Sequence, residues 1–160
     1  MKSKKDVKNI IKILKETYPE AECSLDFSNP FQMAIAVLLS AQCTDARVNI
    51  VTKELFKIAP NAKEMNKLTV EEIEKYISSC GLYKTKAKNI KKLAEKVVKE
   101  YDGNIPDNMG ELMELPGIGR KSANVIMLEA FHNPQGVAID THAKRICNRI
   151  GISKEESQKK

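Results

Sequence analysis

Lys121 and Asp140 are the two residues of this sequence best suited to a chemical role. A lysine amine is a nucleophile only when it is neutral, and a helix N-terminus, the adjacent Arg120 and partial desolvation all favour that neutral form. Asp140 precedes a helical pattern that starts at Thr141, so it is expected to be a helix N-cap whose carboxylate stays ionised. Such a pair could attack an electrophilic carbon and stabilise a cation. Taken singly, a solvated lysine and a purely structural cap explain the two residues better.

The turn before this lysine reads Leu115-Pro116-Gly117-Ile118-Gly119. Pro116 ends the preceding helix, and the two glycines permit a positive φ and leave no side chains in the way, so successive backbone N–H groups can point at one phosphate. Residues 120–126 then begin an amphipathic helix, whose first turn adds unpaired donors and the positive end of a dipole. The segment is predicted to bind an anion, although a plain connection between helices could use the same residues.

Two common nucleotide-binding loops do not fit this spacing. A dinucleotide-binding fingerprint needs a third glycine where Ser122 stands, and a strand before the loop. A Walker loop needs Gly-Lys-Ser, whereas this sequence has Gly119-Arg120-Lys121-Ser122. The turn is therefore expected to bind an anion in a way that differs from both of these nucleotide-binding loops.

Apolar residues recur at helical spacing along the chain, and no segment alternates like a β-strand. The pattern predicts an all-α fold, with a six-helix lobe at residues 24–134 that carries the hairpin 115–119. Residues 1–23 and 135–160 would form an incomplete second helical lobe. The helix that begins at Asn29-Pro30 is apolar on all sides and should be central. The remaining helices of the first lobe are expected near 44–55, 69–81, 90–101, 110–114 and 120–126.

Composition permits a nucleic-acid partner without identifying one. The 160 residues carry 27 Lys and Arg against 21 Asp and Glu, a net charge of +6. No apolar run approaches the roughly 18 residues that span a membrane, and no signal peptide precedes the first helix, so we expect a cytoplasmic, nucleoid-associated monomer. Free thiols rather than a metal site or disulfides are expected, because no two of the cysteines are close in sequence: Cys23, Cys43, Cys80 and Cys147.

Residues 115–124 with 137–142 resemble the helix-hairpin-helix signature and downstream aspartate of DNA glycosylases of the endonuclease III family. Asn29-Pro30-Phe31 leading into 38–45, and then 81–87, also resemble that family in order and approximate distance, so the similarity runs from about Tyr18 to Ile150.

The resemblance implies roles for individual residues. Lys121 would be the Schiff-base nucleophile and Asp140 its carboxylate partner. Asp45 and His142 are expected to have supporting roles, and the place of His142 next to Asp140 favours a hydrogen bond that supports the loop over acid–base chemistry. The implied DNA contacts are Gln42 and Leu82, which would enter the duplex when a damaged nucleotide is flipped out, and the hairpin residues Pro116, Gly117, Ile118, Gly119 and Arg120.

The implied function is base excision repair. An oxidised base, a damaged pyrimidine by expectation, would be removed from duplex DNA through a lysine Schiff base, followed by β-elimination at the abasic sugar. The expected partner is double-stranded DNA that contains damaged bases or abasic sites. One alternative is an adenine or mismatch glycosylase that uses water, although such enzymes generally lack a lysine at position 121. Another is a non-catalytic helix-hairpin-helix binding module.

The sequence departs from the family at its C-terminus. Members usually continue through several helices to a four-cysteine iron–sulfur loop, whereas here residues 153–156 have a capping-box pattern and the chain stops at Lys160. We therefore expect a C-terminally truncated form that encodes no cofactor, because the family's iron–sulfur cluster would need those further cysteines.

Several of these positions also have plainer explanations. Gln42 could be a solvated helix end. Leu82 and Tyr83 follow a glycine, so a contact that locks a Schellman-type helix ending competes with a wedge inserted into DNA. A row of lysines could track phosphates or be simple solvated surface: Lys84, Lys86, Lys88, Lys91 and Lys92.

Overall fold

The computed structural model describes residues 1–154, and every regular element within them is an α-helix, which confirms the all-α class. The capping-box pattern at residues 153–156 lies partly outside the described residues. No helix in the described part is both long and apolar enough to cross a membrane. The chain divides into two compact units, Ser24–Val137 and a second unit that combines Met1–Cys23 with the segment beginning at Ala138.

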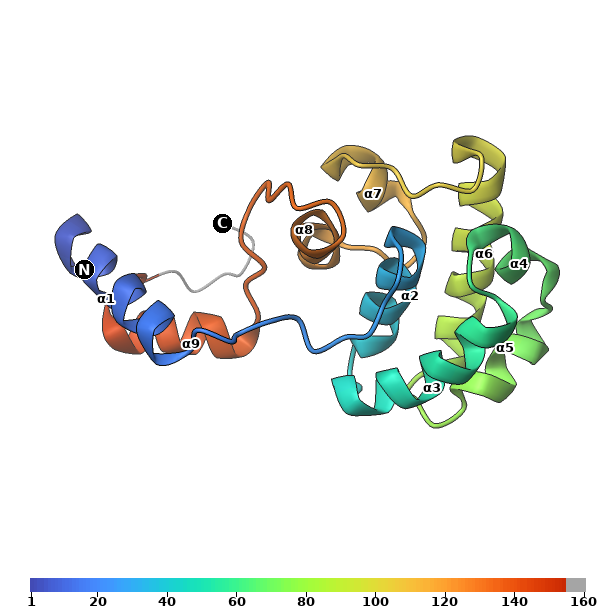
Figure 1. Ribbon diagram of the computed structural model, residues 1–160, viewed down its shortest axis with the longest axis horizontal. Helices are drawn as coiled ribbons and strands as arrows, with labels where there is room; N and C mark the ends of the chain where they lie inside the picture. Colours follow the sequence, from blue (N-terminus) through green and yellow to red (C-terminus); the bar gives the residue numbers. More distant parts are fainter. Residues whose placement is uncertain (155–160) are drawn as a thin grey trace. The chain divides into compact units, whose positions relative to one another are not determined.

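The Ser24–Val137 unit contains the hairpin and seven of the described helices (Figure 1). Their bounds are α2 (Pro30–Ser40), α3 (Asp45–Ile58), α4 (Ala62–Lys67), α5 (Val70–Ile77), α6 (Tyr83–Tyr101), α7 (Met109–Glu114) and α8 (Arg120–Glu129).

Helix α2 is the centre of this unit, as its apolar sequence predicts. Every residue from Phe31 to Leu39 is buried, because α8, α3 and α6 all pack against this helix (Figure 1). Gln32 is polar within this stretch, and its side chain is satisfied by the Ser28 N–H and the Pro60 carbonyl oxygen. Burying one large aliphatic side chain stabilises a fold by about 1.5–3 kcal/mol, so α2 forms a rigid base for the turns at its ends.

Side chains cap the starts of these helices. Thr69 and Glu72 form a capping box at the start of α5. The sequence pattern does not predict α4, which has six residues and places only Ala62 and Met65 in the core. Asn61 caps it by accepting a hydrogen bond from the Glu64 N–H at 3.0 Å. A helix this short has too few apolar residues to show a period.

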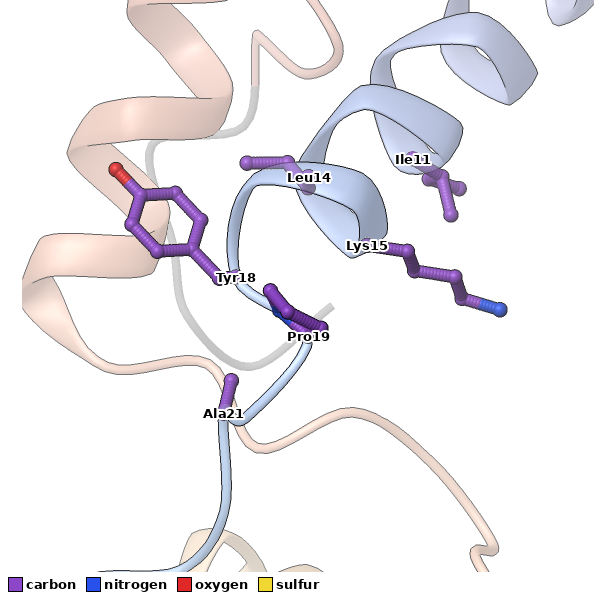
Figure 2. A pocket seen from close by; sticks show the side chains of 6 residues that line it. All are labelled: Ile11, Leu14, Lys15, Tyr18, Pro19 and Ala21. Atoms are coloured by element: carbon purple, nitrogen blue, oxygen red, sulfur yellow. The ribbon is translucent and has the colours of Figure 1, made fainter.

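The second unit contains α1 (Lys4–Thr17) and α9 (Thr141–Ile150), and neither of these two helices has a buried residue. The N–H of Lys2 donates to the carbonyl oxygen of Gly151 at 2.7 Å. An open hollow of about 640 Å³ lies near the end of α1, and Figure 2 shows the side chains that line it. Its lining residues are Ile11, Leu14, Lys15, Tyr18, Pro19 and Ala21. Little apolar surface is removed from water by these two helices.

Candidate active site and DNA interface

The hairpin is anchored by two buried apolar residues, Leu115 and Ile118. The Ile118 N–H donates to the Leu115 carbonyl oxygen at 3.1 Å and closes the turn. The turn joins α7 to α8, and these two helices pack against each other. The segment therefore forms a helix-hairpin-helix in which both glycines have exposed surface.

The two hairpin glycines have different backbone roles. Gly117 has a φ of +82°, in the left-handed region that favours glycine. Gly119 has a φ of −96° and a ψ of 178°, which is extended backbone that any residue adopts. Of the two glycines, only Gly117 therefore has the positive φ that the sequence leads us to expect.

Helix α8 begins without a side-chain cap, because its N-cap residue is Gly119. The N–H groups of its first turn receive no acceptor from a capping side chain, so they can bind an anion. Arg120 and Lys121 are exposed on this turn. The opposite face is buried through Ala123, Asn124, Ile126 and Met127. One exposed helix end thus combines two cationic side chains with uncapped amide donors.

Gln42 and Leu82 lie on neighbouring turns although they are far apart in sequence. Both are exposed, and both have left-handed φ values, +53° and +59°. That conformation costs a non-glycine residue about 1–2 kcal/mol. A Cβ added to Gly81 would lie 3.3 Å from the carbonyl oxygen of Gln42, which shows that the two turns are in van der Waals contact.

Leu82 does not lock a helix ending. Helix α5 ends at Ile77 with Ser78 as its C-cap, and Gly81 does not have the positive φ of a Schellman glycine. Leu82 is instead the N-cap of α6, and this residue is 61% exposed. The Schellman explanation is therefore wrong. An apolar side chain exposed on a turn is well suited to insertion between bases.

The five lysines of the row do not lie on one surface. Neither a phosphate-binding face nor a solvated surface explains Lys86 and Lys91, which are not exposed. Lys86 is buried, and its Nζ donates to the carbonyl oxygens of Leu39 at 2.9 Å and Ala41 at 2.6 Å. Lys91 is half-buried and donates to the backbone and side-chain oxygens of Asn66. The exposed members of the row are Lys84, Lys88 and Lys92.

Asp140 is the N-cap of α9, as predicted, and its Oδ1 accepts a hydrogen bond from the Ala143 N–H at 2.6 Å. It belongs to the second unit, whereas Lys121 belongs to the first. His142 is exposed, and its Nδ1 accepts from Arg145 Nη2 at 3.2 Å, a contact within α9 rather than with the loop. Asp45 accepts a hydrogen bond from the Ser24 hydroxyl.

Known proteins resemble the chain over most of its length. Residues 35–160 match the HhH-GPD superfamily of base excision DNA repair proteins. Endonuclease III of Synechocystis sp. is 48% identical over 155 residues, which are 96% of this chain and 71% of that protein. Endonuclease III of Bacillus subtilis is 47% identical over 137 residues, which are 86% of this chain and 62% of that protein. The chain belongs to the endonuclease III family of base excision repair DNA glycosylases.

Solved structures agree with this membership in the endonuclease III family. A trapped covalent intermediate of endonuclease III with DNA has a TM-score of 0.93 and 42% identity, and the match covers 99% of this chain and 74% of that one. A non-covalent endonuclease III–DNA complex has the same TM-score and identity, with 73% of its chain covered. A thermostable thymine-DNA glycosylase, with 24% identity and a TM-score of 0.79, shares the fold.

The described residues do not fit the iron–sulfur cluster that the endonuclease III resemblance implies. Among residues 1–154, no group of three or more His, Cys, Asp or Glu side chains could hold a metal. Burial raises the pKa of Cys80 to about 11, and a hydrogen bond with Cys43 adds to the shift. A protonated thiol is a poor ligand, because metals bind the thiolate. Cys23 and Cys147 belong to the other unit.

Neither explanation of the lysine row predicts that Lys86 is buried. The spacing of the apolar residues along α6 could have indicated it. Lys86 shares one face of α6 with Ile90, Leu93 and Val97, all of which are buried. The spacing of this apolar stripe, extended by one turn, places Lys86 on the core side of α6.

Proposed function

We propose that this chain is a bifunctional base excision repair enzyme, a DNA glycosylase with lyase activity at apurinic and apyrimidinic sites. Its substrate is double-stranded DNA that contains a damaged base, with oxidised pyrimidines as the substrate class, or an abasic site. One copy of the chain supplies every side chain that the reaction uses, so the enzyme acts as a monomer. Its substrate locates it in the cytoplasm with the nucleoid.

Binding starts at the N-terminus of α8. The uncapped amides of its first turn donate to one backbone phosphate, and the exposed Arg120 guanidinium adds a charge-assisted contact. Contacts of this kind hold the duplex in register and carry no information on the base sequence.

Entry into the duplex uses the paired turns at Gln42 and Leu82. Leu82 fills the gap between bases with its apolar side chain, which lowers the cost of unstacking. Gln42 offers an amide donor and an amide acceptor to the base whose partner has been flipped out.

The reaction uses Lys121 and Asp140. Bound DNA excludes water from the exposed Lys121, while the Asp140 carboxylate accepts the proton that the attacking amine gives up and stabilises positive charge on the sugar. Nζ bonds to C1′ as the bond from C1′ to the base breaks, and the base leaves with that electron pair. The sugar ring opens to a Schiff base, which acidifies the C2′ proton. Loss of this proton breaks the C3′–O bond and releases the 3′ phosphate.

The observation that carries the proposal is the position of Lys121 on the first turn of α8, exposed and directly after the uncapped hairpin. A phosphate bound at the hairpin brings the sugars of the same strand close to this amine. Lysine at this position distinguishes a lyase from a glycosylase that uses water.

Borohydride trapping tests the proposal, because a Schiff base is reducible and a water-derived intermediate is not. Wild-type protein should give a covalent adduct with a duplex that carries an abasic site or an oxidised pyrimidine. Lys121→Gln should give no adduct and keep most of the duplex affinity. Lys99→Gln, at an exposed position in the last turn of α6, is the matched control and should trap normally. Equal trapping by Lys121→Gln and wild type would refute the assignment.

A further inference from the structure

Lys86 carries a buried ammonium group that the proposed reaction does not use. Lys86 is 5% exposed, and its ammonium forms no ion pair with a carboxylate among residues 1–154. Burial of a charge is strongly unfavourable unless hydrogen bonds satisfy it. The partners of Nζ are two backbone carbonyl oxygens, those of Leu39 and Ala41. The position of these carbonyls explains why a cation is tolerated there.

Leu39 and Ala41 lie at the C-terminal end of α2. Ala41 leaves the helical conformation, with a φ of −59° and a ψ of 115°, so the last carbonyls of the helix lack intrahelical donors. These carbonyls also form the negative end of the helix dipole, which favours a cation. Lys86 therefore replaces the missing cap of α2. The next residue after this cap is Gln42, with its left-handed φ.

Lys86 is also hydrogen-bonded to the turn that contains Leu82. The backbone N–H of Lys86 donates to the Leu82 carbonyl oxygen at 3.0 Å, which is the first bond of the α6 ladder. One residue thus connects the end of α2 to the start of α6, through its side chain on one side and its backbone on the other. The contact between Gly81 and Gln42 lies between these two bonds.

We propose that Lys86 is a positioning residue that holds Gln42 and Leu82 in their left-handed conformations and at one fixed separation, ready to enter the duplex. The inference rests on the proposed role of these two side chains in DNA entry. Without the ammonium, the carbonyl of Ala41 loses its donor, and the turn that contains the strained Gln42 backbone keeps only the bond from the Cys43 N–H to the Ser40 carbonyl oxygen and its contact with Gly81. Lys86 touches neither the sugar nor the base, so its effect passes entirely through the two turns.

Duplex entry can be measured without any chemistry. The probe is a duplex that contains a tetrahydrofuran abasic-site analogue, with 2-aminopurine as the neighbouring base, because unstacking of 2-aminopurine raises its fluorescence. Affinity for this duplex is compared with affinity for the same duplex without the analogue. The variants are Lys86→Met, which keeps the volume and removes the donors, and Lys86→Arg, which keeps a buried cation with donors.

Lys86→Met should lower the preference for the analogue-containing duplex by about tenfold, which corresponds to ~1.4 kcal/mol, and should reduce the fluorescence rise. Affinity for the undamaged duplex should change little, because the hairpin supplies it. Lys86→Arg should restore most of the preference. If Lys86→Met does not fold, Lys86→Gln, which keeps an uncharged donor, should show an intermediate loss.

A double-mutant cycle separates positioning from a general structural role. In a Gln42→Ala/Leu82→Ala background there is nothing left to position, so Lys86→Met should cause no further loss of preference. An additional tenfold loss in that background, or an unchanged preference in Lys86→Met alone, would overturn the inference. Failure of the lyase proposal has a different signature, which is equal borohydride trapping by Lys121→Gln and wild type, whatever the fluorescence change in the Lys86 variants.

Discussion

A Cβ atom added to Gly117 would lie 2.7 Å from Cδ1 of Leu38, so the hairpin backbone packs directly against the central helix α2. Gly119, two residues later, has no atom within 4 Å of such a Cβ. The two glycines of the hairpin are therefore needed for different reasons. Gly117 is required by the fold, through its positive φ and its contact with Leu38, whereas the open space at Gly119 is available to an incoming phosphate backbone.

The first prediction compares Gly117→Val with Gly119→Val. Gly117→Val should destabilise the protein by at least about 2 kcal/mol, because it combines a left-handed valine with a steric clash. Gly119→Val should change stability by less than about 1 kcal/mol, since Gly119 is extended and unobstructed. It should nevertheless weaken binding to every duplex, with or without a lesion, because the valine blocks the amides of α8. Thermal denaturation and duplex affinity measure the two effects, and unchanged affinity in Gly119→Val would show that the hairpin is only a structural turn.

The second prediction concerns the charge at Arg120. Arg120→Gln should weaken duplex binding by a similar factor for damaged and undamaged DNA, because a phosphate contact does not depend on the base. The slope of log K against log salt concentration should become shallower by about 1, the value for one phosphate contact. Arg47→Gln, at another exposed position, is the matched control. A loss confined to damaged duplex would assign Arg120 to lesion recognition instead.

The third prediction separates the two roles of Asp140. Asparagine caps helices about as well as aspartate, so Asp140→Asn should keep the bond to Ala143 and alter stability by less than about 0.5 kcal/mol. Loss of the charge should still lower the single-turnover lyase rate by about 100-fold or more. Asp140→Ala should lose the cap as well, at a cost of about 1 kcal/mol. A normal lyase rate in Asp140→Asn would leave this residue with a purely structural role.

Cys80 gives a fourth prediction, on pH. Its pKa is raised from 9.0 to about 11, mainly by burial, so the folded protein keeps the thiol neutral while the unfolded chain ionises it. Its contribution to stability is therefore fully present below pH 9.0 and is lost as the pH rises towards about 11. Denaturant unfolding across this window should show a loss of about 1–2 kcal/mol that Cys80→Ala lacks. Identical pH profiles for the two proteins would contradict the shift.

Local signals made much of the fold predictable. The caps at Asn29, Thr44, Thr69 and Asp140 each depend on a side chain and an N–H three residues later, so the sequence contains the whole interaction. The apolar character of 34–39 likewise predicts burial of α2 without knowledge of its neighbours. The hairpin and Lys121 follow from the same kind of short-range pattern.

Long-range contacts were not predictable in the same way. The bonds from Lys86 to α2, and the contact between Gly81 and Gln42, join segments whose proximity depends on how α6 packs. Residue type alone favoured a solvated or phosphate-binding role for Lys86, because buried lysines are rare. Spacing along the chain likewise gave no indication that Cys43 and Cys80 share a hydrogen bond.

The last prediction follows from the difference in burial between α2 and α9. Every residue from Phe31 to Leu39 is buried, so their amides should exchange with solvent only on global unfolding. Helix α9 has no buried residue, and few apolar contacts oppose its local opening. Amide exchange should therefore be fast from Gly136 to Ser153 in the free 160-residue chain.

Fast opening of α9 would also slow the lyase reaction. Fraying of this helix displaces its N-cap Asp140, and a displacement of about 1 Å can lower the rate roughly 100-fold. Hydrogen exchange followed by mass spectrometry measures both segments, with duplex DNA added in a second experiment. Strong protection throughout Thr141–Ile150 in the free chain, together with full lyase activity, would show that α9 is stable despite its exposed surface.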